Sequence, residues 1–249
     1  MQQTILIAGA SSGLGKRLCE LYCSEGHRVA VAGRRVELLH ELQRSYPELV
    51  VPFQLDISSP DCHWKVETII EQLGGIDILI ITASIVDFNP ELRFEPEKNL
   101  FAINITGFAA VINAGYHYFS EKGSGQIVGV TSIAGARGNR TTPAYSASKA
   151  FQTSYLESIR LKLLSEKKKV TVTELIPGYM DTQMAKGDRL FWITDITKAA
   201  RQAKAAIDQK RRRAFITRRW YYVYTIYKYL PSSIYTYLIN STIKLQKRN

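Results

Sequence analysis

Tyr145 and Lys149 are four residues apart in Tyr145-Ser-Ala-Ser-Lys149, a segment typical of a helix. Side chains at positions i and i+4 lie on one face of a helix, so the lysine ammonium would lie beside the phenol. A neighbouring positive charge lowers the pKa of a tyrosine from its usual value of about 10. Such a tyrosine could exchange a proton with a carbonyl or alcohol oxygen. Taken alone, however, this spacing is more often an incidental pair on a surface helix.

Two further polar residues are candidates for the same site. Ser132 lies thirteen residues before the tyrosine, at the end of the apolar run 126–132. Ligands gather at the carboxyl ends of strands in open α/β sheets. Asn104 lies among apolar neighbours in a predicted helix, where an amide without a partner would cost about 1–3 kcal/mol. The sequence alone leaves two alternatives for Asn104: a buried structural amide, or a part of the catalytic machinery.

A glycine-rich turn lies near the start of the chain. The apolar run Thr4–Ala8 predicts a buried parallel strand, and Gly9-Ala-Ser-Ser-Gly13-Leu-Gly15 leads from it into a predicted helix. Glycines between a strand and a helix let the backbone approach a pyrophosphate, whose charge is favoured at the helix N-terminus. The alternative is a plain tight turn, and the place of the motif between strand and helix favours the phosphate site.

The end of the second predicted strand, 28–33, indicates which dinucleotide is bound. Arg34 and Arg35 follow this strand, and no acidic residue precedes Glu37. An acid at this turn would bind the ribose 2′-hydroxyl of NAD, whereas arginine accommodates the 2′-phosphate of NADP. The alternative is two solvated arginines at a helix start, where the helix dipole disfavours them. The sequence therefore favours NADP.

These motifs in register resemble the short-chain dehydrogenase/reductase family over nearly the whole chain, in its short single-domain branch. The resemblance implies hydride transfer between a nicotinamide and a carbonyl or secondary alcohol. Tyr145 would be the acid/base, and Lys149 would lower its pKa and bind the nicotinamide ribose. Ser132 would bind the reacting oxygen, and Asn104 would kink its helix and hold a water in a proton relay to the lysine.

The resemblance also implies a set of cofactor contacts and shows one departure. Asp56 would meet the adenine, and Ile176 and Thr182 would face the nicotinamide. Relatives read Asn-Asn-Ala-Gly after the fourth strand, where this chain has Ile81-Thr82-Ala83-Ser84, which puts the local cofactor contact in doubt. The expected cofactor-binding residues are Gly9, Ser11, Ser12, Gly13, Leu14, Gly15, Arg34, Arg35, Asp56, Ile57, Ala83, Tyr145, Lys149, Pro177, Gly178 and Thr182.

Strand-like and helical stretches alternate without a linker, which favours one α/β domain. We expect a doubly wound parallel sheet of about seven strands, Rossmann-like, with a helical C-terminal extension. The three cysteines are few and odd in number, which predicts free thiols in a reducing compartment and no metal site. The N-terminus lacks the features of a signal peptide, so a cytoplasmic protein is expected.

The positive charge is concentrated at the C-terminus. Residues 209–249 hold ten Lys and Arg and no acid, whereas the preceding residues are nearly balanced. We divide the chain into a catalytic domain, 1–217, and a tail of the same domain, 218–249. Trp220, Val223, Tyr224 and Tyr227 would share one helical face, and Ile234, Leu238 and Leu245 would continue it after Pro231.

This tail is too short in its apolar stretches to span a membrane, but it suits an anionic membrane surface. Trp and Tyr favour the headgroup level, and Lys and Arg meet anionic lipid. We therefore expect a cytoplasmic protein attached peripherally to the inner face of the membrane. Two alternatives stay open, a cap over the substrate cleft and a subunit interface. No nucleic acid is expected, since no recognition module accompanies the tail.

The substrate is expected to be a lipophilic carbonyl or alcohol. Residues 183–200 would form a lid with Met184, Leu190, Phe191 and Trp192 as apolar candidates. The long predicted helices at 96–121 and 144–166 pair in relatives, which implies a homodimer or homotetramer. Two alternative functions stay open, an NADP-sensing regulator with little turnover and an isomerase or epimerase with the same tetrad.

Overall fold

The computed structural model describes residues 1–182 and 192–237. Within them, seven parallel strands form one sheet in the order β3-β2-β1-β4-β5-β6-β7, which confirms the predicted doubly wound α/β fold. The strands are β1 (Thr4–Ala8), β2 (Arg28–Gly33), β3 (Val50–Gln54), β4 (Ile78–Ile81), β5 (Ser124–Val130), β6 (Lys169–Pro177) and β7 (Arg213–Ile216).

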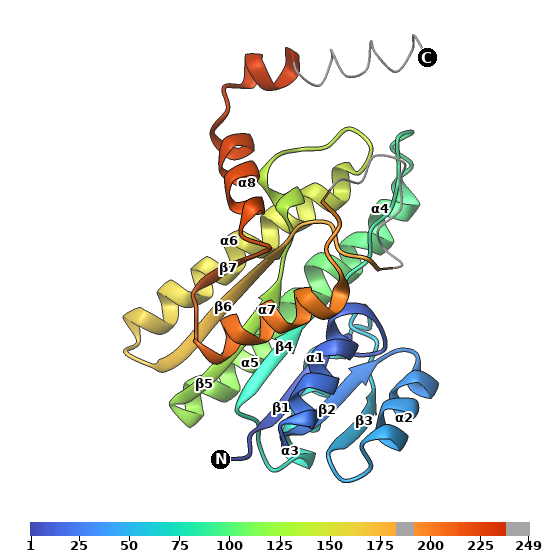
Figure 1. Cartoon of the computed structure of the whole chain (residues 1–249), viewed down its shortest axis with the longest axis vertical. Coiled ribbons are helices and arrows are strands. Elements are labelled where there is room, and N and C mark those ends of the chain that lie inside the picture. Colours follow the sequence, from blue (N-terminus) through green and yellow to red (C-terminus); the bar gives the residue numbers. More distant parts are fainter. Residues whose placement is uncertain (183–191, 238–249) are drawn as a thin grey trace.

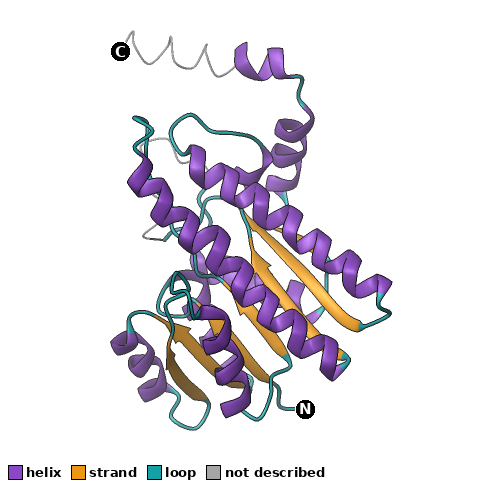
Figure 2. Ribbon diagram, turned by 180° about the vertical axis from the view of Figure 1, so that it is seen from behind, coloured by secondary structure: helices purple, strands orange, loops and turns teal. Residues whose placement is uncertain are grey.

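The central strands are continuous apolar runs because helices cover both of their faces (Figure 2). The helices are α1 (Gly13–Ser24), α2 (Val36–Ser45), α3 (Cys62–Gln72), α4 (Phe94–Phe101), α5 (Phe108–Lys122), α6 (Pro143–Ser165), α7 (Ile196–Asp208) and α8 (Arg219–Tyr229). A π-helical segment, Ala102–Gly107, joins α4 to α5, and a short 3₁₀ helix, Ile133–Ala136, follows β5.

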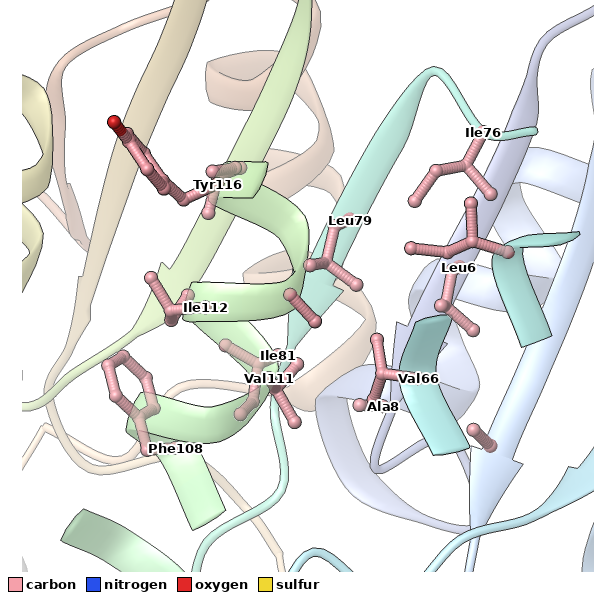
Figure 3. Packing of buried hydrophobic residues seen from close by; sticks show 14 of the residues in the cluster. Leu6, Ala8, Val66, Ile76, Leu79, Ile81, Phe108, Val111, Ile112 and Tyr116 are labelled. Atoms are coloured by element: carbon pink, nitrogen blue, oxygen red, sulfur yellow. The ribbon is translucent and has the colours of Figure 1, made fainter. Parts of the chain in front are cut away.

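The core has two layers, one on each face of the sheet. On one face the buried side chains of α1, α2 and α7 pack on alternate residues of the strands, such as Ile7 and Ile80. On the other face α3, α5 and α6 pack on the intervening residues. Figure 3 shows part of this second layer, where Val111 of α5 lies beside Ile81 of β4. Both layers hold the carboxyl ends of the strands in fixed positions.

All strands are parallel, but the side of the sheet on which successive strands are added changes between β1 and β4. These strands are hydrogen-bonded neighbours, with Ile7 opposite Ile80 and Ala8 opposite Ile81. The strand order extends from this pair in opposite directions, which makes it the topological switch point of the sheet. Ligands of open α/β sheets bind in the crevice at such a point, outside the carboxyl ends of the strands.

The C-terminal region is helical, as expected, and begins with α8 directly after β7. In Figure 1, α8 lies against the domain, and residues 232–237 form a further helical turn at the far end of the molecule. Trp220 and Tyr224 of the predicted face are buried against the domain, whereas Tyr227 is 45% exposed. Leu238 and Leu245 lie outside the described residues. The structure thus divides the predicted apolar stripe between buried and exposed positions.

Candidate active site

Tyr145 and Ser132 meet where β5 ends and α6 begins. Pro143 occupies the first turn of α6, a position that proline favours because its fixed φ suits a helix start. Ser132 is extended and caps the 3₁₀ helix, since the Ala134 N–H donates a hydrogen bond of 3.1 Å to its Oγ. The hydroxyl of Ser132 also hydrogen-bonds to Tyr145. The two predicted catalytic hydroxyls are therefore in contact.

Burial raises the pKa of Tyr145, and the hydrogen bond from Ser132 offsets only part of this effect. The Lys149 Nζ lies 5.6 Å from the centre of the phenol ring. We expected the ammonium to lower the pKa of the phenol, and the structure has it raised instead. The reason is that burial dominates at Tyr145 and that the ammonium is directed to other partners.

Lys149 is 2% exposed, and its ammonium is held inside the domain. Its Nζ donates to the Val130 carbonyl at 3.2 Å and to the Gln152 Oε1 at 2.9 Å. Burial lowers the pKa of Lys149 to about 7, because a charged amine loses its hydration there. Lys149 is thus a buried amine that can change its charge near neutral pH.

Asn104 is fully buried and lies in the π-helical segment, so the predicted helix irregularity is present. Its Oδ1 accepts hydrogen bonds from the Ser84 hydroxyl at 3.0 Å and the Ile85 N–H at 2.9 Å. Its Nδ2 donates to the Ile85 carbonyl at 2.8 Å and to the Ser148 Oγ at 3.2 Å. The side chain therefore ties the segment after β4 to α6 and has both its donors and its acceptor in use.

Gln152 is a residue of this site that the sequence analysis did not identify. It lies three residues after Lys149 on α6 and is fully buried. Besides accepting from Lys149, it donates from Nε2 to the Asn104 carbonyl at 2.8 Å. The available signal was its spacing, since positions 145, 149 and 152 share one helical face.

The glycine turn has the conformations that its residues predict. Gly9 and Gly13 have φ of 100° and 57°, where a side chain would be strained. A Cβ added to Gly9 would also lie 2.7 Å from the Thr82 Oγ1. The Thr82 hydroxyl donates to the Gly9 carbonyl at 2.9 Å. The threonine at this departure from the family pattern therefore holds the turn in place.

Arg35 bridges from the end of β2 to this turn. Its guanidinium donates to the hydroxyls of Ser11 and Ser12 at 2.9 and 2.8 Å. Arg34 is exposed beside it and lies close enough to help lower the pKa of Asp56. Asp56 is partly buried, which opposes its ionisation, but the hydroxyl and N–H of Ser58 bind one of its oxygens at 2.7 and 2.9 Å. The predicted basic turn and acid thus lie at one edge of the crevice.

Three further predicted cofactor positions are Leu14, Ile57 and Ala83. Leu14 and Ile57 are buried in the core, 5% and 6% exposed. The Ala83 N–H donates to the Ala8 carbonyl at 3.0 Å. Ala83 and the glycine turn are thereby in direct contact at the switch point.

The loop after β6 closes the opposite side of the site. Ile176 and Pro177 are buried at the end of this strand, and Thr182 lies beside the turn, with its Cγ2 3.8 Å from a Cβ built on Gly13. The Trp220 indole packs directly on Gly178, and the ring of Tyr179 lies 5.4 Å from it. α8 therefore covers the loop that was expected to face the nicotinamide.

The predicted lid is described only in part. Met184, Leu190 and Phe191 lie outside the described residues. Trp192 is 49% exposed, and its ring lies 5.8 Å from that of Trp220. The one described lid aromatic thus packs on the C-terminal helix.

A family model for short chain dehydrogenases matches residues 3–191. The chain belongs to this family. It is therefore an oxidoreductase.

Proteins of this family from bacteria are similar to the chain over most of its length. An uncharacterised oxidoreductase of Myxococcus xanthus is 34% identical over 73% of this chain and 74% of its own. Another, of Mycobacterium tuberculosis, is 31% identical over 86% of this chain and 88% of its own. A short chain dehydrogenase of Burkholderia cenocepacia, solved in complex with NADP, superposes with a TM-score of 0.81 at 22% identity, over 96% of this chain and 99% of its own.

The glycine turn and its surroundings fit a dinucleotide of the kind this family uses. A Cβ on Gly13 would meet only Thr182, so the backbone there is open toward the crevice.

In the described part of the chain, no group of three or more His, Cys, Asp or Glu residues could hold a metal ion. Within residues 1–182 and 192–237, no helix is both long enough and apolar enough to cross a membrane.

Proposed function

We propose that the chain is an NADP-dependent oxidoreductase that interconverts a lipophilic carbonyl compound and its alcohol. The observation that carries this proposal is the contact between the hydroxyls of Ser132 and Tyr145, with Lys149 buried behind them on the same helix. This arrangement offers two hydroxyls to a single oxygen atom of a substrate. The glycine turn lies on the other side of the same crevice.

The proton chemistry follows from the two hydroxyls. When bound, NADPH supplies the hydride that adds to the carbonyl carbon. The Ser132 hydroxyl donates a hydrogen bond to the substrate oxygen, and Tyr145 gives that oxygen its proton. The raised pKa of Tyr145 keeps the phenol protonated near neutral pH, as a proton donor requires.

Replacement of the phenol tests this assignment. Tyr145→Phe removes the proton donor and leaves the ring, so turnover should fall by a factor of about 10² to 10⁴. Binding of NADPH, followed by its fluorescence, should persist. A screen of aldehydes, ketones and 3-oxoacyl thioesters, followed by NADPH absorbance, identifies the substrate for the comparison. Activity of the variant close to that of the wild type would refute the role of Tyr145.

The preference for NADP is supported by the position of Arg35. Its guanidinium is held against Ser11 and Ser12 of the turn, and Arg34 is exposed next to it. A 2′-phosphate at this edge would meet both arginines, which form strong charge-assisted hydrogen bonds with phosphate. The structural neighbour from Burkholderia cenocepacia carries NADP. Dissociation constants for NADPH and NADH decide the preference, and tighter binding of NADH would contradict it.

A homodimer, or a tetramer built from it, is proposed through α5 and α6. Leu161 and Leu164, one turn apart on α6, are 61% and 53% exposed, so a second copy of the chain could cover them. Sedimentation velocity at micromolar concentration tests this assembly. A single 28.2 kDa species would contradict it.

The tail is proposed to attach the protein to an anionic membrane on the cytoplasmic side. α8 buries Trp220 and Tyr224, but its other face carries Tyr222, Ile226 and Tyr229, which are 67%, 61% and 75% exposed. These positions share one helical face, and the region from residue 209 onward holds ten basic residues and no acid. Aromatic and basic residues together suit the membrane interface, whereas two copies of so basic a segment would repel each other.

This attachment would bring lipid close to the active site. The Arg137 guanidinium, from the segment after Ser132, donates to the Leu230 carbonyl at 2.8 Å and lies 4.7 Å from the centre of the Tyr235 ring. The Tyr235 hydroxyl donates to the Gly138 carbonyl at 2.7 Å. A membrane bound by the tail would thus contact the segment that borders the catalytic serine, which supports a lipophilic substrate.

Co-sedimentation with anionic liposomes tests the membrane proposal. The triple variant Tyr222→Ser, Ile226→Ser and Tyr229→Ser removes the exposed face and leaves Trp220 and Tyr224 in place. It should pellet much less than the wild type at low salt. Trp64→Ser, which removes a 68% exposed aromatic from α3, is the matched control and should pellet like the wild type. Equal pelleting of the wild type and the triple variant would contradict the proposal.

A further inference from the structure

Gln152 connects two residues of the candidate site through both ends of its side-chain amide. Its Oε1 accepts from the Lys149 Nζ at 2.9 Å, and its Nε2 donates to the Asn104 carbonyl at 2.8 Å. Gln152 is fully buried, so these partners are not exchanged for solvent. A buried amide bound at both ends has one orientation, with its oxygen toward the ammonium.

The π-helical segment makes this connection possible. In an α-helix the Phe108 N–H would donate to the Asn104 carbonyl, four residues earlier. Here it donates to the Ile103 carbonyl, five residues earlier, and the N–H of the next residue donates to the Ile105 carbonyl. The Asn104 carbonyl is therefore released toward α6, where the Gln152 amide reaches it.

We propose that Gln152 is a positioning residue for Lys149, fixing the ammonium beside Tyr145 in the place where the family resemblance implies a relay water. The inference rests on the proposed reaction, in which Lys149 acts on the phenol. A neutral amide suits this role because its oxygen stabilises the ammonium without cancelling its charge. A carboxylate at the same position would bind the lysine and neutralise it.

Few ionisable groups face this pair, which makes the effect of Gln152 measurable. Tyr145 lies on the same helix, and Tyr179, after β6, influences the pKa of Tyr145. The buried carboxylate of Glu174 on β6 is already bound by the Arg213 guanidinium at 2.7 Å and by the hydroxyls of Thr131 and Thr153. Burial alone accounts for the lowered pKa of Lys149, so its hydrogen bond to Gln152 opposes that effect without an ion pair.

The first experiment measures the pKa of Lys149 directly, without turnover. The full-length chain is labelled with ¹³C-lysine and titrated by NMR, and Lys149→Met identifies the signal. Gln152→Leu removes a hydrogen bond to the charged form, so the pKa of Lys149 should fall by about one to two units. Gln152→Glu places a negative charge there, so the pKa should rise. The nearly isosteric glutamate variant keeps the test valid if the leucine variant does not fold.

Gln126→Leu is the matched control for loss of a buried amide. Gln126 is 3% exposed, and its Nε2 donates to the Thr173 hydroxyl and the Ile207 carbonyl, away from Lys149. This variant should lose stability without moving the pKa of Lys149. An unchanged pKa in both Gln152 variants would overturn the inference. Equal shifts in the Gln126 control would also overturn it.

A second measurement connects the residue to catalysis. In the oxidation direction, kcat rises with pH as Tyr145 ionises. Gln152→Leu leaves less positive charge on Lys149, and Gln152→Glu adds a negative charge beside the ammonium, so both variants should move this rise to higher pH. A purely structural role would lower the amount of active enzyme without moving the curve, and an unmoved curve would overturn the inference. If the wild type has no turnover but its Lys149 titrates as expected, the positioning role holds and the proposed reaction fails.

Discussion

Replacing Thr82 by valine tests how this chain holds its glycine turn without the asparagine of its relatives. The hydroxyl of Thr82 donates to the Gly9 carbonyl at 2.9 Å and lies 3.3 Å from the Ala8 carbonyl. Valine has nearly the same shape, so the packing against Gly9 and Gly15 is kept and only the hydrogen bonds are lost. Thr82→Ser keeps the hydroxyl and is the matched control.

The size of the effect follows from the burial of these groups. One hydrogen bond contributes about 0.5–1.5 kcal/mol net, and a buried acceptor left without a partner costs about 1–3 kcal/mol. Gly9 is partly exposed, so water can replace some of the loss. We therefore expect Thr82→Val to lower the free energy of unfolding by about 1–2 kcal/mol. For a chain of this size, that corresponds to a fall in Tm of roughly 2–8 °C.

The two assays are urea unfolding, for stability, and NADPH fluorescence titration, for the turn itself. Because the same hydroxyl fixes the turn that faces the pyrophosphate, affinity for NADPH should fall together with stability. Thr82→Ser should keep most of the stability and most of the affinity for NADPH. If Thr82→Val unfolds and binds NADPH like the wild type, the threonine does not hold the turn and the reasoning is refuted.

Three other outcomes follow from the structure. Replacing Arg34 and Arg35 by alanine should raise the dissociation constant for NADPH about 10- to 100-fold, since charge-assisted hydrogen bonds contribute about 1.5–3 kcal/mol. The dissociation constant for NADH should stay nearly unchanged. An equal rise for both dinucleotides would contradict the 2′-phosphate role. Trp220→Ala should lower the free energy of unfolding, measured in urea, by about 3–5 kcal/mol, since Trp220 is 1% exposed. An unchanged free energy of unfolding would mean that the packing of α8 does not stabilise the domain. The folded pKa of Lys149, about 7, is below its unfolded value, so its charging disfavours the folded state at low pH, and stability should rise between about pH 7 and 10. Lys149→Met should abolish this part of the rise in urea titrations at several pH values, and an unchanged rise would refute the assignment.

The alternation of apolar runs and helices was sufficient to predict the sheet and its direction. Buried parallel strands have a distinct pattern, since both faces are apolar, and β1 and β4 follow it closely. The family resemblance also implied that Ser132 and Tyr145 share one site, and the structure brings their hydroxyls together. These features depend on local sequence.

Properties that depend on the environment of a group were harder to predict. The spacing of Tyr145 and Lys149 gives their distance along a helix but not how deeply the fold buries them, and burial reverses the expected direction at the phenol. Gln152 was missed because its partner is a backbone carbonyl released by the π-helical segment. The amphipathic stripe of α8 predicted a buried face but not whether lipid or protein covers it, and Trp220 packs on Gly178.

That contact between Trp220 and Gly178 limits which substitutions the chain can accumulate over evolutionary time. A Cβ at position 178 would overlap the indole ring, so any larger residue there requires a smaller one at position 220. Position 178 lies within the segment that the family model matches, and position 220 lies beyond it. The segment that the family model matches and the C-terminal segment beyond it must therefore change together at this pair. Exchange of C-terminal segments between family members would fail wherever this pairing is broken.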